Sequence, residues 1–146
     1  MRSFIGVLAV SFLVVLSGCA STFDPRDRAI QLTAGQPQQG FLGPGTDIYV
    51  FTLDKPSDVV LESRVAIASS MAVTPNAVLY DAEGNVVRRD WRSGDWENFR
   101  IAITLPAGTW YLHVYDGQAC FSMMDDDCME GDRNYEVSLE VTELPR

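Results

Sequence analysis

The chain has 146 residues, of which 20 are acidic and 11 are Lys or Arg, and its formal net charge is −9. This length suits one domain. The acidic balance excludes nucleic acid as a partner, because phosphate binding needs clustered lysine and arginine side chains. Hydrophobic residues make up 47% of the chain, so we expect a folded domain with a buried core rather than a disordered segment.

The N-terminal region has the layout of a secretory signal, with one positive charge followed by an apolar segment over residues 4–16. This segment is too short for a membrane-spanning helix, which takes about 20 apolar residues. It ends in Leu16–Cys19, a sequence (LSGC) that resembles the lipobox of bacterial lipoproteins. The resemblance implies cleavage after residues 1–18 and acylation of Cys19. We therefore expect a lipid-anchored protein of the cell envelope, held at the outer membrane where the cell has one, on its periplasmic face or at the surface.

The other two cysteines, Cys120 and Cys128, remain as a pair once Cys19 carries lipid. An oxidising compartment favours a disulfide between them, and closing so short a loop contributes about 2 to 3 kcal/mol in the chain-entropy account. The alternatives are two free thiols or two metal ligands. Thiolate metal sites usually recruit further Cys or His residues, which this loop lacks.

Residues 19–29 are expected to form a lipidated tether, and nothing in the polar stretch 20–29 predicts a stable element. From residue 30 the dominant signal is period-two alternation between turn residues, which is typical of an all-β domain. The alternating sets that predict core faces are Tyr49, Phe51 and Leu53; Val59, Leu61, Ser63, Val65 and Ile67; Phe99, Ile101 and Ile103; Trp110, Leu112 and Val114; Tyr135, Val137, Leu139 and Val141. Residues 81–85 (DAEGN) predict a hairpin turn. We expect residues 30–146 to form a single antiparallel, jelly-roll-like β-sandwich of about eight to nine strands.

The order of these motifs resembles the bacterial pre-peptidase C-terminal domain. The matching segments are residues 47–53 (DIYVFTL), 76–81 (NAVLYD) with Gly84, 105–114 (LPAGTWYLHV) and 134–139 (NYEVSL). The resemblance implies a compact, non-catalytic β-sandwich with a binding or accessory role. Two features depart from the family pattern: Asn76 stands where Asp is usual, and the loop over residues 120–131 is enlarged.

Catalytic motifs are absent from the sequence. His113 is the only histidine, and we expect it to be a surface or half-buried residue in mid-strand. There is no G-x-S-x-G elbow, H-E-x-x-H pair or glycine-rich phosphate loop. We therefore expect no enzyme and no cofactor other than calcium, and a hydrolase with an unrecognised carboxylate site is the minor alternative.

The acidic loop after Cys120 offers a candidate calcium site. Asp125, Asp127, Glu130 and Asp132 carry hard oxygen ligands of the kind that calcium prefers. Their spacing does not fit an EF-hand, so a solvated loop is the alternative. If calcium binds, the domain is a calcium-stabilised module.

A cluster of arginine and tryptophan residues forms the third candidate. It consists of Arg88, Arg89, Trp91, Arg92 and Trp96. Arg and Trp often anchor interfaces, and indole rings also stack on sugars and cations. The alternative is that the two tryptophans cap one end of the core. The sequence thus favours a lipid-anchored binding or accessory module for an envelope protein or glycan.

Overall fold

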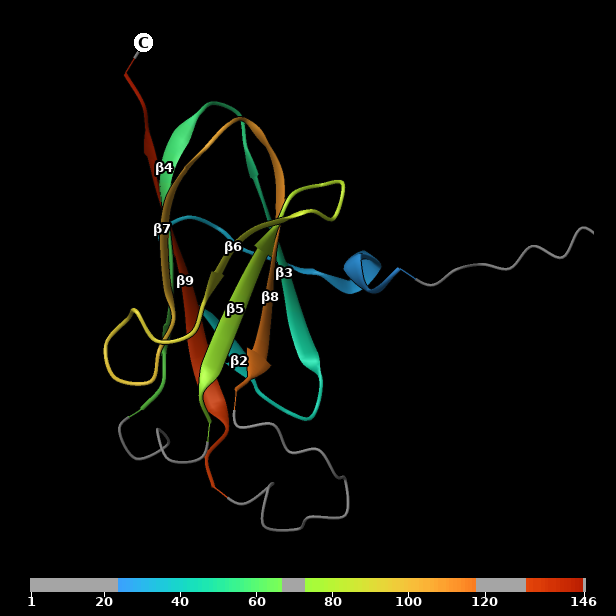
Figure 1. Cartoon of the computed structure of the whole chain (residues 1–146), viewed down its shortest axis with the longest axis vertical. Coiled ribbons are helices and arrows are strands. Elements are labelled where there is room, and N and C mark those ends of the chain that lie inside the picture. Colours follow the sequence, from blue (N-terminus) through green and yellow to red (C-terminus); the bar gives the residue numbers. More distant parts are fainter. Residues whose placement is uncertain (1–23, 67–72, 118–130, 146) are drawn as a thin grey trace, which may run out of the picture.

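The computed structural model describes residues 24–66, 73–117 and 131–145, and these residues form two β-sheets packed face to face (Figure 1). A short 3₁₀ helix, η1 (Pro25–Arg28), precedes the sheets. The strands are β1 (Ile30–Gln31), β2 (Gln38–Phe41), β3 (Thr46–Leu53), β4 (Ser57–Arg64), β5 (Pro75–Tyr80), β6 (Val86–Asp90), β7 (Arg100–Leu105), β8 (Gly108–Asp116) and β9 (Asn134–Glu143). The predicted all-β sandwich is confirmed.

The strand order is β1-β3-β8-β5-β6 in one sheet and β2-β9-β4-β7 in the other. All pairs are antiparallel except β1 with β3, which run parallel with Ile30 opposite Tyr49. β6 and β7 are edge strands of different sheets, and the chain crosses from one sheet to the other between them. This crossing carries both tryptophans of the predicted Arg–Trp cluster.

The core lies between the sheets and follows the predicted alternation. Register places Phe51 of β3 opposite Trp110 of β8, and Tyr49 opposite Leu112. All four side chains are buried, as are most inward residues of β4, β7 and β9. Each such side chain contributes about 1.5 to 3 kcal/mol when it is removed from water. The predicted core residues at the periphery, Ile103 and Val141, are only partly buried, and Ile67 lies outside the described residues.

A chain of buried hydroxyl groups connects the two sheets. Tyr135 of β9 donates a hydrogen bond of 2.7 Å to the Asp47 carboxylate of β3, and its oxygen lies 2.6 Å from the hydroxyl of Tyr49. Because the Tyr135 proton is used on Asp47, Tyr49 donates to Tyr135. Burial raises the pKa of Asp47 and raises that of Tyr49 to about 12. Gly40 of β2 lies against these hydrogen-bonded side chains. A Cβ atom at Gly40 would lie 2.4 Å from the Tyr135 ring, so the position has no room for a side chain.

One end of the sandwich holds a buried ion pair. The Arg133 guanidinium lies 2.6 Å from the Asp116 carboxylate, and these side chains are only 3% and 7% exposed. Arg133 also donates to the backbone carbonyl of Leu42, and Asp116 accepts from the backbone N–H of Thr74 at 3.0 Å. These bonds join four separate segments, so the pair fixes how the chain closes this end of the sandwich.

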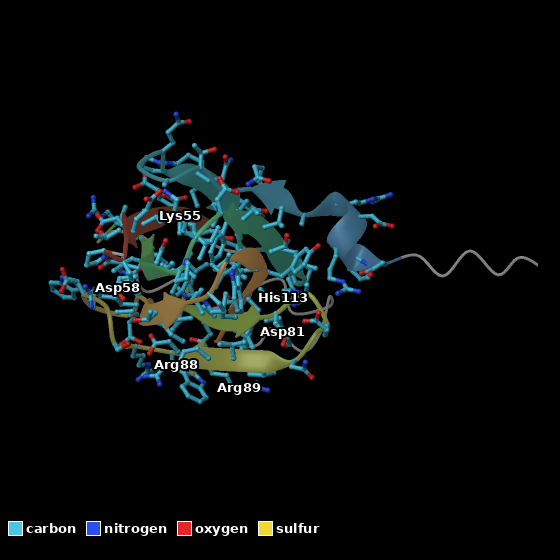
Figure 2. The ribbon with its side chains drawn as sticks, turned by 90° about the horizontal axis from the view of Figure 1, so that it is seen from above. Lys55, Asp58, Asp81, Arg88, Arg89 and His113 are labelled. Carbon is cyan, nitrogen blue, oxygen red and sulfur yellow. The ribbon has the colours of Figure 1, made fainter. Side chains whose placement is uncertain are left out.

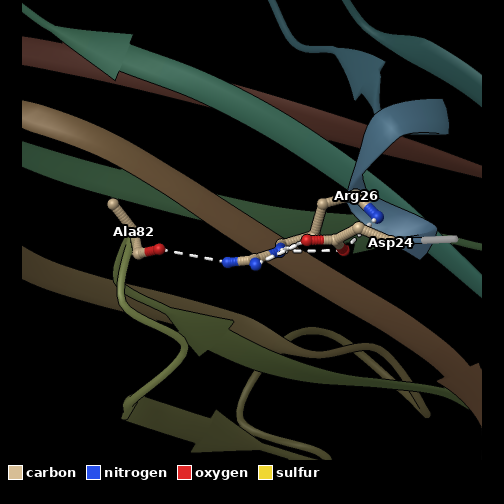
Figure 3. A network of polar contacts seen from close by, with 3 residues as sticks. All are labelled: Asp24, Arg26 and Ala82. Carbon is tan, nitrogen blue, oxygen red and sulfur yellow. Dashed lines mark hydrogen bonds and ion pairs between the residues drawn. The ribbon is translucent and has the colours of Figure 1, made fainter. Parts of the chain in front are cut away.

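The expectation of no stable element in residues 20–29 was wrong, because η1 packs on the outer face of the five-stranded sheet. Asp24 caps the helix by accepting from the Arg26 backbone N–H at 3.0 Å. The Arg26 guanidinium lies 5.5 Å from the centroid of the Tyr111 ring. It also donates to the carbonyl of Ala82 at 3.0 Å (Figure 3). The sequence of residues 20–29 is short and polar, and it carries no sign of the residues on which η1 packs. Those residues, Ala82 and Tyr111, lie far along the chain. Across the part of the chain that the structure describes, no helix has the length and apolar character to cross a bilayer.

Candidate partner-binding surface

The predicted arginine and tryptophan residues lie on β6 and on the turn that follows it. We use the name Trp turn for residues 91–99. β6 pairs with β5 on one side, and no described strand lies on its other side. Its first four residues are all exposed to solvent. Arg88 and Arg89 project from this outermost strand (Figure 2).

Asp90, the last residue of β6, organises the start of the Trp turn. Its carboxylate accepts hydrogen bonds from the backbone N–H and the hydroxyl of Ser93 and from the backbone N–H of Arg100. Ser93 in turn donates to the carbonyl of Arg100 at 2.9 Å. An Asp side chain that accepts from the backbone a few residues later stabilises a turn. Asp90 therefore fixes both ends of the crossing from β6 to β7.

Asn98 anchors the other end of the Trp turn to the core. Its side-chain oxygen accepts from the buried hydroxyl of Ser63 at 2.9 Å, and its amide nitrogen donates to the carbonyl of Asp95 at 2.8 Å. The same Ser63 hydroxyl accepts from the backbone N–H of Phe99 at 3.1 Å. Gly94 donates to the carbonyl of Asn98 at 3.0 Å. The turn is thus tied internally and to β4, which makes it preorganised.

The two tryptophans of the turn face solvent. Trp91 is 56% exposed and Trp96 is 73% exposed. Trp96 also adopts a φ of 60°, a left-handed conformation that bulky residues rarely take. The alternative that these indoles cap the core does not hold, because both side chains are more exposed than buried, whereas the nearby Phe99 is fully buried. The turn presents its apolar surface outward.

The charges of the surface are unevenly compensated. Arg92 lies 2.9 Å from the Glu97 carboxylate, so these two side chains form an ion pair. Neither Arg88 nor Arg89 forms an ion pair with any residue that the structure describes. The acid nearest to them in sequence, Asp90, is engaged by backbone N–H groups. Within the described ranges, the two arginines of this edge therefore carry positive charge that no ion pair neutralises.

His113 is half-buried on the outer face of the five-stranded sheet, as predicted. Its ring centroid lies 4.5 Å from that of Tyr80, and its Nε2 is buried without a hydrogen-bond partner among the described residues. Burial lowers the pKa of this histidine, and the nearby charge of Arg26 lowers it further. The imidazole is therefore neutral at neutral pH.

The remaining predicted site residues are mostly beyond the described ranges. Cys19, Cys120, Cys128, Asp125, Asp127 and Glu130 all lie outside them. Asp132 is described, and its carboxylate accepts from the backbone and side-chain amides of Asn134 at 3.0 and 2.6 Å. Among the described residues, no three candidate metal ligands come together. The lipid, disulfide and calcium assignments therefore stay predictions.

Sequence reasoning missed the framework of the Trp turn. Asp90, Ser93 and Asn98 are residue types that favour turns, so their positions carried a signal for local structure. Ser63 was placed on the inner face of its strand, but nothing in the sequence connected it with Asn98, which lies 35 residues further on. Such a long-range hydrogen bond depends on how strands pair.

Comparison with solved structures supports the fold. The pre-peptidase C-terminal domain of a collagenase from Bacillus anthracis superposes with a TM-score of 0.56 at 19% identity, over 77% of this chain and 94% of that one. PliG from Aeromonas hydrophila, a periplasmic inhibitor of g-type lysozyme, superposes with a TM-score of 0.51 at 10% identity, over 78% and 96%. The resemblance to the pre-peptidase C-terminal domain is thus confirmed at the level of fold. No family model and no curated protein matches the sequence.

Proposed function

We propose that this protein is a non-catalytic, lipid-anchored binding module of the cell envelope, and that its recognition surface consists of Arg88, Arg89, Trp91, Arg92 and Trp96. This group is named the Trp–Arg surface below. The observation that carries the proposal is the exposure of two indoles on a turn held by hydrogen bonds from both ends. The partner is an envelope protein or glycan.

The energetics of the Trp turn support a binding role. An indole buries roughly 150–250 Å² when it packs, and the transfer of apolar area from water contributes about 25 cal/mol per Å². Trp91 and Trp96 forgo most of that gain in the free domain. Because the turn is already ordered, a partner that covers these rings gains this energy with little loss of conformational entropy.

The neighbouring folds add support of a coarser kind. One is the domain of a collagenase and the other is a periplasmic lysozyme inhibitor, so a protein of this fold acts by binding another protein. At 19% and 10% identity these likenesses concern the fold. The envelope location proposed here depends instead on the signal segment and on Leu16–Cys19.

The binding role is tested by crosslinking the full lipidated protein in cells and identifying what it captures. The Trp91→Ala, Trp96→Ala double variant is expected to lose the captured partner while keeping its unfolding midpoint, because neither indole belongs to the core. Phe41→Ala is the matched control, since Phe41 is an exposed aromatic on the edge of the other sheet. Unchanged capture by the folded double variant refutes the proposal.

The lipid anchor is tested separately by feeding cells a clickable palmitate analogue. The full chain is expected to incorporate the label and to sediment with membranes. The Cys19→Ala variant is expected to do neither. Label on the variant, or an unlabelled native chain, contradicts acylation at Cys19.

A further inference from the structure

β6 is an edge strand whose side chains are positively charged on both faces. Arg89 lies opposite Val78, an outward residue of β5, whereas Arg88 lies opposite Leu79, a core residue. The two arginines therefore flank the strand on opposite sides of the sheet. Half of the backbone N–H and C=O groups of an edge strand point away from its neighbour, and here no described strand pairs with them.

These arginines decide which strand can add to this edge. A second copy of the same chain would bring arginine against arginine, and like charges on directly opposed strands are destabilising. An acidic strand has the reverse effect, because an extended segment alternates its side chains between the two faces and so reaches both Arg88 and Arg89. Arg–Arg contact therefore disfavours pairing with a second copy, and the edge favours acidic partners.

Neither arginine is neutralised by an ion pair with a described residue, which leaves both available to an acidic partner. The chain carries a net charge of −9, yet the two arginines form no ion pair among the described residues. At physiological ionic strength charges are screened over about 8 Å, so a segment that lies on β6 responds mainly to the charges beside it. These are Arg88 and Arg89 together with Asp90, whose carboxylate is held by the backbone N–H groups of Ser93 and Arg100.

The Trp turn supplies an apolar anchor beside the strand. Trp91 directly follows the last residue of β6, and its ring is more than half exposed. Backbone pairing alone gives little specificity, whereas a side-chain contact at the end of the added strand sets its register. The register irregularity of β6 between its pairs with Leu79 and Tyr80 limits continuous pairing to a short segment.

We propose that β6 binds an extended acidic polypeptide segment as an added strand, with Arg88 and Arg89 contacting its carboxylates and the Trp turn covering an apolar residue at its end. The partner class is therefore an acidic protein rather than a glycan. This inference rests on the proposed function, because it names the partner and the binding mode of the Trp–Arg surface.

The test uses the full lipidated chain, labelled with ¹⁵N and held in detergent micelles, and two synthetic peptides. One is the decapeptide STVDEVTFGS, capped at both ends, and the other carries Lys in place of Asp and Glu. The acidic peptide is expected to shift the backbone amide signals of residues 86–90 and the indole signals of Trp91 and Trp96. Its binding is expected to weaken as salt is raised. A version of the acidic peptide with Pro in place of its sixth residue, a Val near the middle, should bind poorly. Proline has no backbone N–H and cannot donate its hydrogen bond to the neighbouring strand.

Charge reversal provides the decisive arm. The Arg88→Glu, Arg89→Glu variant is expected to bind the acidic peptide at least about fivefold more weakly, as the loss of two exposed ion pairs implies, and to prefer the lysine peptide. Arg64→Gln, on the other sheet, is the control and should bind as the native chain does. Equal binding of both peptides, no response of the β6 amides, or an unaltered preference in the reversed variant overturns the inference.

Its failure can be distinguished from failure of the proposed function. If the Trp91→Ala, Trp96→Ala variant loses its cellular partner while charge reversal at β6 does not, the binding role stands and the acidic strand is refuted. Capture of a glycan at the Trp–Arg surface would likewise support the binding role and refute the acidic strand. Loss of the partner in both variants, together with binding of the acidic peptide, supports both proposals.

Discussion

The Asp90 carboxylate at the end of β6 accepts a hydrogen bond of 2.9 Å from the backbone N–H of Arg100, the first residue of β7. This contact joins the edge strands of the two sheets across the open side of the sandwich. It also sets the span over which the Trp turn must close. The exposed indoles of the Trp turn therefore depend on the hydrogen bonds of one carboxylate at the end of β6.

Replacing Asp90 with Ala is expected to loosen the Trp turn without unfolding the domain. The N–H groups of Ser93 and Arg100 lose their acceptor, and water replaces it at this exposed site, so the free energy of unfolding should fall by about 1 to 2 kcal/mol. Amide exchange at both residues should accelerate. Asp95→Ala removes the same charge from the turn and is the control. Equal exchange rates in the two variants would contradict this role for Asp90.

Gly40→Ala is expected to destabilise the contact between β2 and the buried tyrosines. The added methyl group would lie 2.4 Å from the Tyr135 ring and 2.6 Å from the Tyr49 hydroxyl oxygen, so the strand must move. Overpacking of this kind costs about 1 to 3 kcal/mol, measured as a shift in the urea midpoint. Gly45→Ala meets no atom within 4 Å and should change stability by less than about 0.5 kcal/mol. Similar midpoints for both variants would refute the packing argument.

The buried pair of Arg133 and Asp116 is expected to be strongly coupled. Arg133→Leu leaves an uncompensated carboxylate in a site that is 7% exposed, and such a loss costs about 3 to 5 kcal/mol. The double variant Arg133→Leu, Asp116→Leu should recover part of that stability, because no buried charge remains. Urea unfolding of the four proteins in a double-mutant cycle measures the coupling. Additive effects would show that the two groups act independently.

His113 is expected to make the fold less stable as the solution becomes acidic. Its pKa in the folded domain lies below the ordinary value of 6.5, so the unfolded chain binds the proton first. The contribution to stability is therefore complete above about pH 6.5 and is lost as the pH falls from there toward the folded pKa. The difference in stability between the native chain and His113→Phe, measured from pH 7 to pH 5, isolates this group from the carboxylates. A difference that is constant with pH contradicts the prediction.

Arg26→Ala is expected to release η1 from the sheet. The guanidinium holds both the Tyr111 ring and the Ala82 carbonyl, so its removal should accelerate amide exchange at Asp27, whose N–H bonds to the Asp24 carbonyl at 3.0 Å. The unfolding midpoint should hardly move, since Arg26 also pairs with the Asp24 carboxylate at 2.6 Å and ion pairs as exposed as this one contribute little. Slow exchange at Asp27 in the variant would show that the helix docks by other means.

Much of the core could be predicted from alternation alone. Tyr49, Phe51 and Trp110 were assigned to inner faces, and all three are buried. Alternation works because successive side chains of a strand point to opposite faces, so a strand that is buried on one face has an apolar residue at every second position. It could not predict that Ile103 is only partly buried, since that depends on where the facing sheet ends. The parallel pairing of β1 with β3 was equally invisible, because a two-residue strand carries no periodic signal.

The sequence by itself determined the fold class and the core faces, since each depends on local patterns. The envelope address stays a proposal drawn from residues 16–19. Only the tertiary structure decided that Trp91 and Trp96 face solvent and do not cap the core. The physical reason is that exposure depends on which strands pair. Ser63 meets Asn98 only after β4 and β7 have paired, and Asp90 meets Arg100 only where the two sheet edges come together. Those contacts turn a segment rich in arginine and tryptophan into an ordered surface.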